Sequence, residues 1–132
     1  MERKPHILII DDDFEISRLF GGKLSKEGFE VMYAPEGNEG RELARRFQPD
    51  VILLDFRLPG DDGLMVAQRL KEEQLTKHIP IILLTNEDLT REAEKAIKEL
   101  WIAEYIHKST PIDELAPRLK KIIGQVEKKS IG

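Results

Sequence analysis

The sequence contains no cysteine, no excess of basic residues and no long hydrophobic run. Without cysteine there is no disulfide framework, thiolate site or Cys-based zinc site, and a reducing cytoplasm is the expected compartment. The 21 basic and 25 acidic residues give a formal net charge of −4, which argues against nucleic-acid binding, because such domains usually carry a basic excess. Asp11 closes the first apolar run, which is too short for a signal peptide or a membrane span.

The remaining composition is that of one globular domain. The chain has 132 residues, of which 40% are hydrophobic and 35% are charged, enough for a single core and too few for two. We expect residues 1–127 to form this domain and residues 128–132 to form a flexible tail. The sequence does not decide whether the chain stands alone or belongs to a longer protein.

Five apolar runs of strand length alternate with segments of helical period. The runs cover residues 6–10, 29–34, 51–54, 79–84 and 103–107. Most of them lack strict alternation, which is typical of strands that are buried on both faces. The segments between them repeat apolar residues at helical spacing, as Ile16, Leu19, Phe20 and Leu24 do. This pattern predicts an α/β fold, with a five-stranded parallel sheet flanked by five helices.

The expected strand order is 2-1-3-4-5, the flavodoxin-like, doubly wound arrangement. Its topological switch point lies between strands 1 and 3, outside their carboxyl ends, where such sheets bind ligands. Strand 1 runs into Asp11, Asp12 and Asp13, and strand 3 runs into Asp55. The order therefore brings these acids together at one edge of the sheet.

A cluster of carboxylates at this edge favours a bound divalent cation. Alone, like charges at close range raise each other's pKa, whereas Mg²⁺ takes one or two carboxylates together with waters and phosphate oxygens. One carboxylate can then act as nucleophile and form an aspartyl phosphate. Thr85 and Lys108 end strands 4 and 5 on the same rim, where they offer a hydroxyl and a cation to a phosphoryl group.

Four motifs in this order carry a resemblance to a known family. They are "ILIIDDD", the Asp-x-x-x-Pro-x-x-x-Gly pattern of "DFRLPGDDG", "PIILLT" and "YIHK". From His6 to about Val126 the chain resembles the CheY-like receiver domain of bacterial two-component response regulators. The resemblance implies a cytoplasmic phosphoprotein of phosphorelay signal transduction that catalyses its own phosphorylation and dephosphorylation without being a conventional turnover enzyme.

The resemblance also implies a role for each site residue. Asp55 would accept the phosphoryl group from a histidine kinase or a His-phosphotransfer domain. Asp12 would ligate Mg²⁺ directly, Asp11 directly or through water, and the main-chain carbonyl of Arg57 would complete the protein ligands, with Mn²⁺ as a substitute metal. Thr85 would donate a hydrogen bond to the phosphoryl group.

Two further residues complete the implied switch. Lys108 would pair with the phosphoryl group, and Tyr105 matches the family's switch aromatic, which turns inward as Thr85 shifts toward the phosphate. The surface of helix 4, strand 5 and helix 5 would then bind a downstream effector or a covalently linked output domain, or form a phosphorylation-linked homodimer. The resemblance implies no direct binding of nucleic acid or membrane by this domain, and the chain shows no recognisable output module.

Several positions depart from the family pattern. Asn86 stands where a small residue is usual and is expected to crowd the phosphoryl pocket. Ser109 replaces the proline after Lys108, which favours a trans peptide, because a cis bond before a residue other than proline costs about 2.5–4 kcal/mol. We expect Arg57 and Glu87 to form an ion pair across the mouth of the site and to slow dephosphorylation.

Other interpretations remain beside this one. A haloacid-dehalogenase-like phosphatase also places Asp-x-Asp after strand 1, as Asp11 and Asp13 allow, but leaves Asp55 unexplained. A pseudo-receiver used only for docking would be expected to lose an acid or the lysine. Asp13 is expected to cap the first helix, and Trp101 to pack at a helix end. The cognate kinase, the output, the phosphoryl lifetime and the oligomeric state are not determined by the sequence.

Overall fold

The main sheet is the predicted five-stranded parallel sheet. The computed structural model describes residues 3–58 and 60–131, without the side chains of Asp61 and of residues 125–131. The strands are β1 (His6–Ile10), β2 (Glu30–Ala34), β3 (Val51–Asp55), β6 (Ile81–Thr85) and β7 (Glu104–His107). They lie in the order β2-β1-β3-β6-β7, which is 2-1-3-4-5 when these five strands are counted along the chain.

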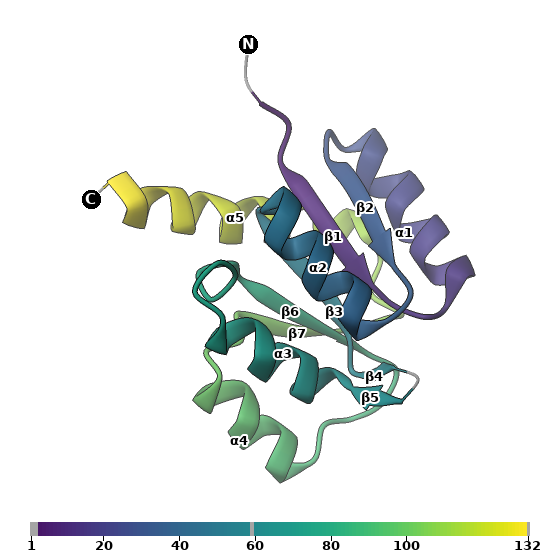
Figure 1. The fold of residues 1–132 in the computed structure, drawn as a ribbon. Coiled ribbons are helices and arrows are strands. Elements are labelled where there is room, and N and C mark those ends of the chain that lie inside the picture. The colour runs from purple at the N-terminus through teal and green to yellow at the C-terminus, as the bar shows by residue number, and fades with distance from the viewer. Residues whose placement is uncertain (1–2, 59, 132) are drawn as a thin grey trace.

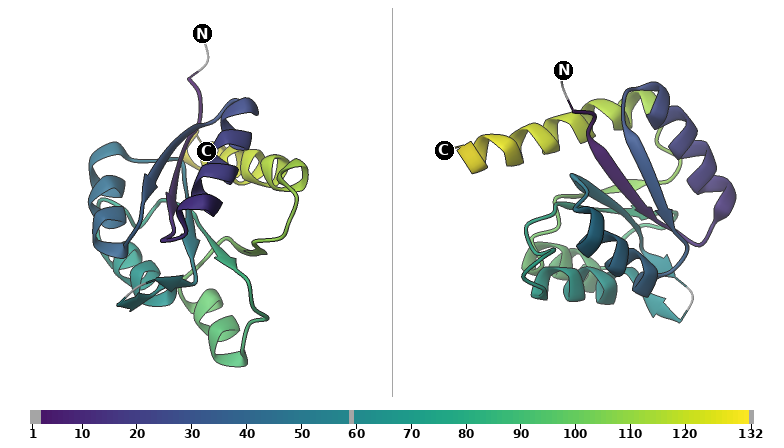
Figure 2. Two further views of the ribbon diagram at one scale, coloured as in Figure 1. Left: turned by 90° about the vertical axis from the view of Figure 1, so that its right-hand side faces the viewer. Right: turned by 45° about the horizontal axis from the view of Figure 1, so that its top comes forward.

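Helices cover both faces of this sheet (Figures 1 and 2). They are α1 (Phe14–Lys26), α2 (Gly37–Phe47), α3 (Gly63–Glu72), α4 (Arg91–Glu99) and α5 (Ile112–Ile131). Residues of α1 and α5 share one apolar core with alternate strand residues such as Ile7 and Ile9. Residues of α2, α3 and α4 share the other core with Leu8 and Ile10. Because both faces are covered, the central strands are apolar at nearly every position.

A short antiparallel pair follows β3 and was not predicted. Strands β4 (Arg57–Leu58) and β5 (Asp61–Asp62) have two residues each and pair Arg57 with Asp62. Pro59, the proline of the family pattern, lies outside the described residues. The side chain of Asp62 accepts a hydrogen bond from the Met65 amide at 2.7 Å and so caps α3. The hairpin carries the chain from the end of β3 directly into α3.

The helix ends follow from local chemistry. The side chain of Asp13 accepts hydrogen bonds from the amides of Glu15 and Ile16 at 3.1 and 3.2 Å, so the predicted cap of α1 is confirmed. Gly28 follows this helix with a φ of +98°, a conformation that favours glycine. The helical face predicted for α1 is correct except at Leu19, which is 52% exposed.

The side chain of Trp101 is exposed, which differs from the prediction for this residue. The residue was predicted to pack at a helix end, yet it is 84% exposed. It stands after α4 with a φ of +56°, and the amide of the next residue, Ile102, bonds the Ile97 carbonyl at 3.0 Å. This hydrogen bond closes the helix in a Schellman-type turn, which directs the indole outward while Ile102 enters the core.

The C-terminal boundary of the domain stays a prediction. The backbone of α5 continues through Ile131, and the expected boundary at residue 127 falls inside this helix. The side chain of Val126, near which the resemblance to the family ends, lies outside the described residues. Within the part of the chain that the structure describes, no helix is both long enough and apolar enough to cross a membrane.

Candidate functional site

The predicted site residues meet at the carboxyl edge of the sheet. Register pairs such as Ile10 with Leu54 and Thr85 with His107 place the ends of neighbouring strands side by side. A pocket of about 250 Å³ opens there. Its lining includes Asp12, Asp55, Arg57, Thr85, Asn86 and Lys108. Parallel strands end at one edge, and this is why residues from four separate motifs converge.

Lys108 is held between two buried carboxylates. Its Nζ lies 2.8 Å from Asp11 Oδ2 and 3.3 Å from Asp55 Oδ1. The three side chains are 7%, 0% and 8% exposed, respectively. Backbone amides hold the carboxylates as well, since Asp11 Oδ1 accepts from Asp13 at 2.9 Å and Asp55 Oδ1 from Arg57 at 3.2 Å. The ammonium therefore offsets part of a buried negative charge.

The environment shifts the pKa values of both partners. Burial, followed by the negative charge of Asp11, raises the pKa of Asp55 from 3.8 to about 6. The Arg57 amide and the Lys108 ammonium oppose this shift without cancelling it. Burial alone would lower the pKa of Lys108, but its hydrogen bonds and charge interactions with Asp11 and Asp55 outweigh burial and raise it. At about pH 6, Asp55 is therefore close to half protonated, and it is mostly ionised at higher pH.

The acidic cluster has the donor set of a hard divalent cation. Carboxylate oxygens of Asp11, Asp12 and Asp55 all lie within 4.8 Å of one another. Asp11 and Asp55 are buried, whereas Asp12 is exposed at the mouth. Mg²⁺ binds oxygen ligands and keeps several waters, so this combination of buried and exposed carboxylates fits it. The expected contribution of the Arg57 carbonyl stays a prediction.

The loop after β6 closes one side of the site. The Thr85 hydroxyl donates to the Glu87 carbonyl and accepts from the Glu87 amide, both at 3.0 Å. The predicted ion pair is present, with Arg57 Nε 2.7 Å from Glu87 Oε1 and a second contact of 2.9 Å to Oε2. Asn86 lines the pocket between these residues, and Tyr105 on β7 is 46% exposed.

Replacement of Gly63 by alanine is expected to destabilise the protein by about 1–3 kcal/mol, the usual cost of overpacking. An added Cβ would meet the Asp55 carbonyl oxygen and would lie 2.8 Å from the Phe56 Cα. Backbone atoms cannot rotate away as the end of a side chain can. Urea denaturation measures the loss. Gly22→Ala is the control, because a Cβ there meets nothing within 4 Å, and equal effects at the two glycines would contradict the argument.

His107 is a site feature that the sequence analysis missed. The three histidines, His6, His78 and His107, are isolated in the sequence, a pattern that favours structural or surface roles. In the structure the ring of His107 bridges two loops, since Nε2 lies 3.1 Å from the Asn86 carbonyl oxygen and Nδ1 lies 2.7 Å from Ser109 Oγ. The only sequence signal was its position, next to Lys108 at the end of a strand.

The peptide between Lys108 and Ser109 is trans, as expected, because the described residues contain no cis bond.

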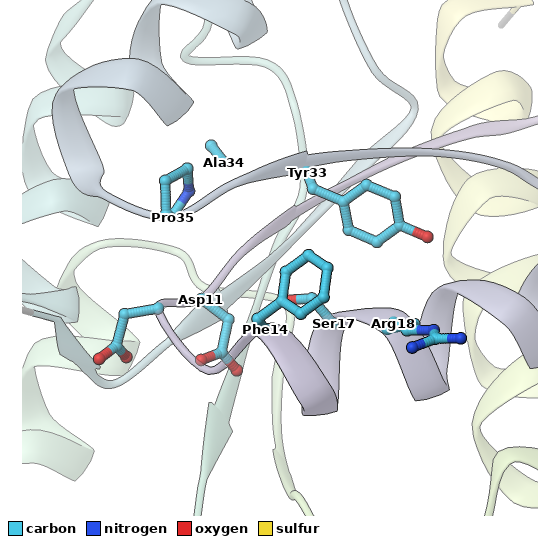
Figure 3. A pocket seen from close by; sticks show the side chains of 8 residues that line it. Asp11, Phe14, Ser17, Arg18, Tyr33, Ala34 and Pro35 are labelled. Carbon is cyan, nitrogen blue, oxygen red and sulfur yellow. The ribbon is translucent and has the colours of Figure 1, made fainter.

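A second pocket adjoins the acidic cluster on the side of α1. It has a volume of about 540 Å³, and Figure 3 shows Phe14, Ser17 and Tyr33 at its lining together with Asp11. Phe14 is 76% exposed. The ring of Tyr33 lies where a Cβ at Gly21 would be. Gly21 therefore leaves room for the phenol group of Tyr33 beside this pocket.

Comparison with known proteins agrees with this geometry. The family model described as the response regulator receiver domain matches residues 7–120. The transcriptional regulator RpaA of Synechocystis sp. is 34% identical over 124 residues, which are 94% of this chain and 51% of RpaA. The phosphate regulon regulator PhoB of Pseudomonas aeruginosa is 36% identical over 119 residues, 89% of this chain and 51% of PhoB. The chain thus spans about half the length of these two relatives.

Solved structures show the same fold. A CheY-like receiver domain from Methanospirillum hungatei superposes with a TM-score of 0.89 at 24% identity, covering 96% of this chain and 99% of that one. A putative response regulator from Chloroflexus aurantiacus gives a TM-score of 0.83 at 31% identity, covering 92% and 99%. With the acids, the hydroxyl and the lysine on one edge of this sheet, the chain belongs to the family of response regulator receiver domains of two-component systems.

Proposed function

We propose that this receiver domain takes a phosphoryl group from a histidine kinase or a His-phosphotransfer protein onto Asp55, with Mg²⁺ as cofactor and Mn²⁺ as a substitute. The observation that carries the proposal is the buried contact of Lys108 with Asp11 and Asp55 beside the exposed Asp12. This arrangement supplies a nucleophile, a cation and ligands for a metal. The proposal includes a cytoplasmic location, and the chemistry is a single phosphorylation followed by hydrolysis rather than steady turnover of a substrate.

In the proposed transfer an Asp55 oxygen attacks the phosphorus atom while the phosphorus–nitrogen bond of the phosphohistidine breaks. The contacts from Lys108 and Arg57 fall on Oδ1, so we assign the attack to Oδ2. A pKa of about 6 leaves Asp55 ionised, and therefore nucleophilic, above that pH. The metal, held by Asp11, Asp12, Asp55 and the Arg57 carbonyl, would neutralise charge on the transferring group. Lys108 would then turn from Asp55 Oδ1 to a phosphoryl oxygen.

Phosphorylation would be coupled to a change of surface. In the described structure the Thr85 hydroxyl is bonded to its own loop and Tyr105 is half exposed. We propose that Thr85 moves to the phosphoryl group and that Tyr105 then turns inward. This change would alter the surface of α4, β7 and α5 for a downstream effector, a covalently linked output domain or a second copy of the chain. The domain itself would not bind nucleic acid or membrane.

The test is the intact mass after incubation with acetyl phosphate, with and without Mg²⁺. We expect a gain of one phosphoryl group that requires Mg²⁺, is absent in Asp55→Asn and persists in Asp88→Asn, which removes an exposed carboxylate of the nearby loop. A gain that persists in Asp55→Asn would contradict the assignment of the acceptor. Steady phosphate release from small esters would instead favour the phosphatase, and a folded protein that binds Mg²⁺ without any gain would favour the docking module.

Arg57→Ala is expected to shorten the lifetime of the phosphorylated protein by about two- to fivefold, the range that one exposed ion pair supports. The Arg57–Glu87 pair lies across the pocket mouth, and its side chains are 69% and 54% exposed. Without the pair, we expect water to reach Asp55 more readily. The lifetime is followed by the decay of the phosphorylated mass after removal of the donor.

Lys95→Ala is the matched control for this measurement, because it removes another exposed ion pair, with Glu99 on α4. An unchanged lifetime in Arg57→Ala, or equal changes in both variants, would refute a role for the pair. Asn86, expected to crowd the same pocket, would slow the access of the donor and of hydrolytic water.

A further inference from the structure

We propose that His107 is a positioning residue that holds the loop after β6 in its resting arrangement and so sets how readily Thr85 moves toward Asp55. The inference rests on the proposed function, because the movement of Thr85 has a purpose only if Asp55 carries a phosphoryl group. No motif of the sequence indicated this role, and the imidazole touches neither Asp55 nor the other acids in the contacts described above. It acts on the site through the backbone of a neighbouring loop.

The ring of His107 makes a side-chain hydrogen bond just beyond the end of β6. His107 lies opposite Thr85 in the register of β6 and β7. The Lys108 amide bonds the Thr85 carbonyl at 2.8 Å, and one residue beyond the end of β6 the imidazole Nε2 lies 3.1 Å from the Asn86 carbonyl oxygen. The side chain of His107 thus joins the loop after β6 to the loop after β7.

The contacts of Nδ1, the other ring nitrogen, show which partner donates in the bond between Nε2 and the Asn86 carbonyl. The Ser109 amide, which can only donate, donates to Nδ1 at 3.2 Å, and Ser109 Oγ lies 2.7 Å from the same atom. Nδ1 is therefore an acceptor, and the neutral ring carries its proton on Nε2. The imidazole donates that proton to the Asn86 carbonyl while the loop of Lys108 fixes the ring orientation.

The segment from Thr85 to Glu87 is consequently held at three points. The Thr85 hydroxyl is bonded to both backbone groups of Glu87. The Glu87 carboxylate is bound by Arg57. The Asn86 carbonyl, between these two residues, is bound by His107. All three interactions belong to the same loop conformation.

The hydroxyl proton of Thr85 is already donated to the Glu87 carbonyl. To donate to a phosphoryl group on Asp55, Thr85 must give up this bond, and its movement displaces the adjoining Asn86 carbonyl from the ring of His107. The ring therefore stabilises the conformation in which Thr85 is bonded to Glu87, and not the one in which Thr85 has moved toward Asp55. An interaction made in only one of two conformations shifts the equilibrium toward that conformation. Loss of one neutral hydrogen bond changes such an equilibrium by about 2- to 10-fold.

The test compares His107→Asn with His107→Gln. The asparagine amide can replace Nδ1 but is too short to reach the Asn86 carbonyl, whereas the glutamine amide can present an N–H group near the position of Nε2. In the absence of Mg²⁺ and phosphodonor, we expect the Glu87 amide to exchange its hydrogen about 2- to 10-fold faster in His107→Asn than in the natural chain, and at nearly the natural rate in His107→Gln.

The second measurement is the affinity for beryllofluoride with Mg²⁺, a mimic of the phosphoryl group on Asp55. We expect tighter binding in His107→Asn by the same factor of about 2 to 10, with rescue to the natural affinity in His107→Gln. Natural exchange and affinity in His107→Asn, or equal changes in both variants, would overturn the proposal. If the natural chain takes neither beryllofluoride nor phosphate, the proposed function fails, while the exchange comparison still decides whether His107 holds the loop.

Discussion

Asp55→Asn is expected to stabilise the unphosphorylated protein by about 1–3 kcal/mol at pH 7 in the absence of metal, while it abolishes phosphorylation. Burial and the charge of Asp11 raise the pKa of Asp55 to about 6, so the folded protein holds an ionised group that the unfolded chain solvates better. At about 1.4 kcal/mol per pKa unit, the shift from 3.8 to about 6 sets the upper end of this range. Asparagine removes the charge and keeps a side-chain oxygen for the Arg57 amide.

The stability that Asp55→Asn gains over the natural chain depends on pH in a defined way. A group whose folded pKa is raised contributes stability below its unfolded pKa and loses it as the pH rises through the folded value. The natural chain therefore loses stability between about pH 4 and pH 6, and Asp55→Asn does not. The two should be nearly equally stable below pH 4 and should differ fully above pH 7.

Urea denaturation of both chains from pH 4 to pH 8 without divalent metal measures this difference. Asp88→Asn, which removes an exposed carboxylate of the loop after β6, serves as the control and should show little change. A difference that stays constant over this pH range would mean that ionisation of Asp55 is not its cause. If Asp55→Asn is less stable than the natural chain at pH 7, the ionised Asp55 side chain does not destabilise the folded protein.

Lys108→Ala is expected to destabilise the metal-free protein by about 3–5 kcal/mol at neutral pH, the cost of removing one partner from a buried ion pair. The carboxylates of Asp11 and Asp55, at 2.8 and 3.3 Å from its Nζ, would lose their counter-charge inside the protein. The pKa of Lys108 is raised in the folded state, so its contribution is fully present at neutral pH and is lost only as the pH rises through that pKa.

Divalent metal should reverse much of this loss. Without the ammonium, the cation in direct contact with Asp11 and Asp55 is gone, and Mg²⁺ should bind the variant more tightly than the natural chain and stabilise it by mass action. Acetyl phosphate should nevertheless phosphorylate the variant poorly, because the cation that pairs with the phosphoryl group is missing.

The measurement is urea denaturation with a chelator and with Mg²⁺. Lys121→Ala, which removes an exposed lysine of α5, is the matched control and is expected to change stability by less than about 0.5 kcal/mol. A loss below about 1 kcal/mol in Lys108→Ala, or a loss that Mg²⁺ does not reduce, would show that Lys108 does not balance the buried acids.

Much of the fold was predictable because the central strands are buried on both faces. In β1, β3 and β6 nearly every residue is apolar and buried, so the strands appear in the sequence as plain apolar runs. The hairpin of β4 and β5 escaped prediction because two-residue strands show no periodicity. Trp101 was placed wrongly because the spacing of α4 gave no indication of the left-handed turn that directs its side chain into solvent.

The sequence by itself determined which residues end the parallel strands, and hence that Asp11, Asp55, Thr85 and Lys108 share one edge of the sheet. Only the tertiary structure decided how their side chains are paired: Lys108 between two acids, the Thr85 hydroxyl on Glu87 and the ring of His107 on Asn86. The physical reason is that the position and the end of a buried strand follow from burial, which the apolar character of its residues shows directly. A hydrogen bond depends on the side-chain rotamers and loop conformations that packing selects.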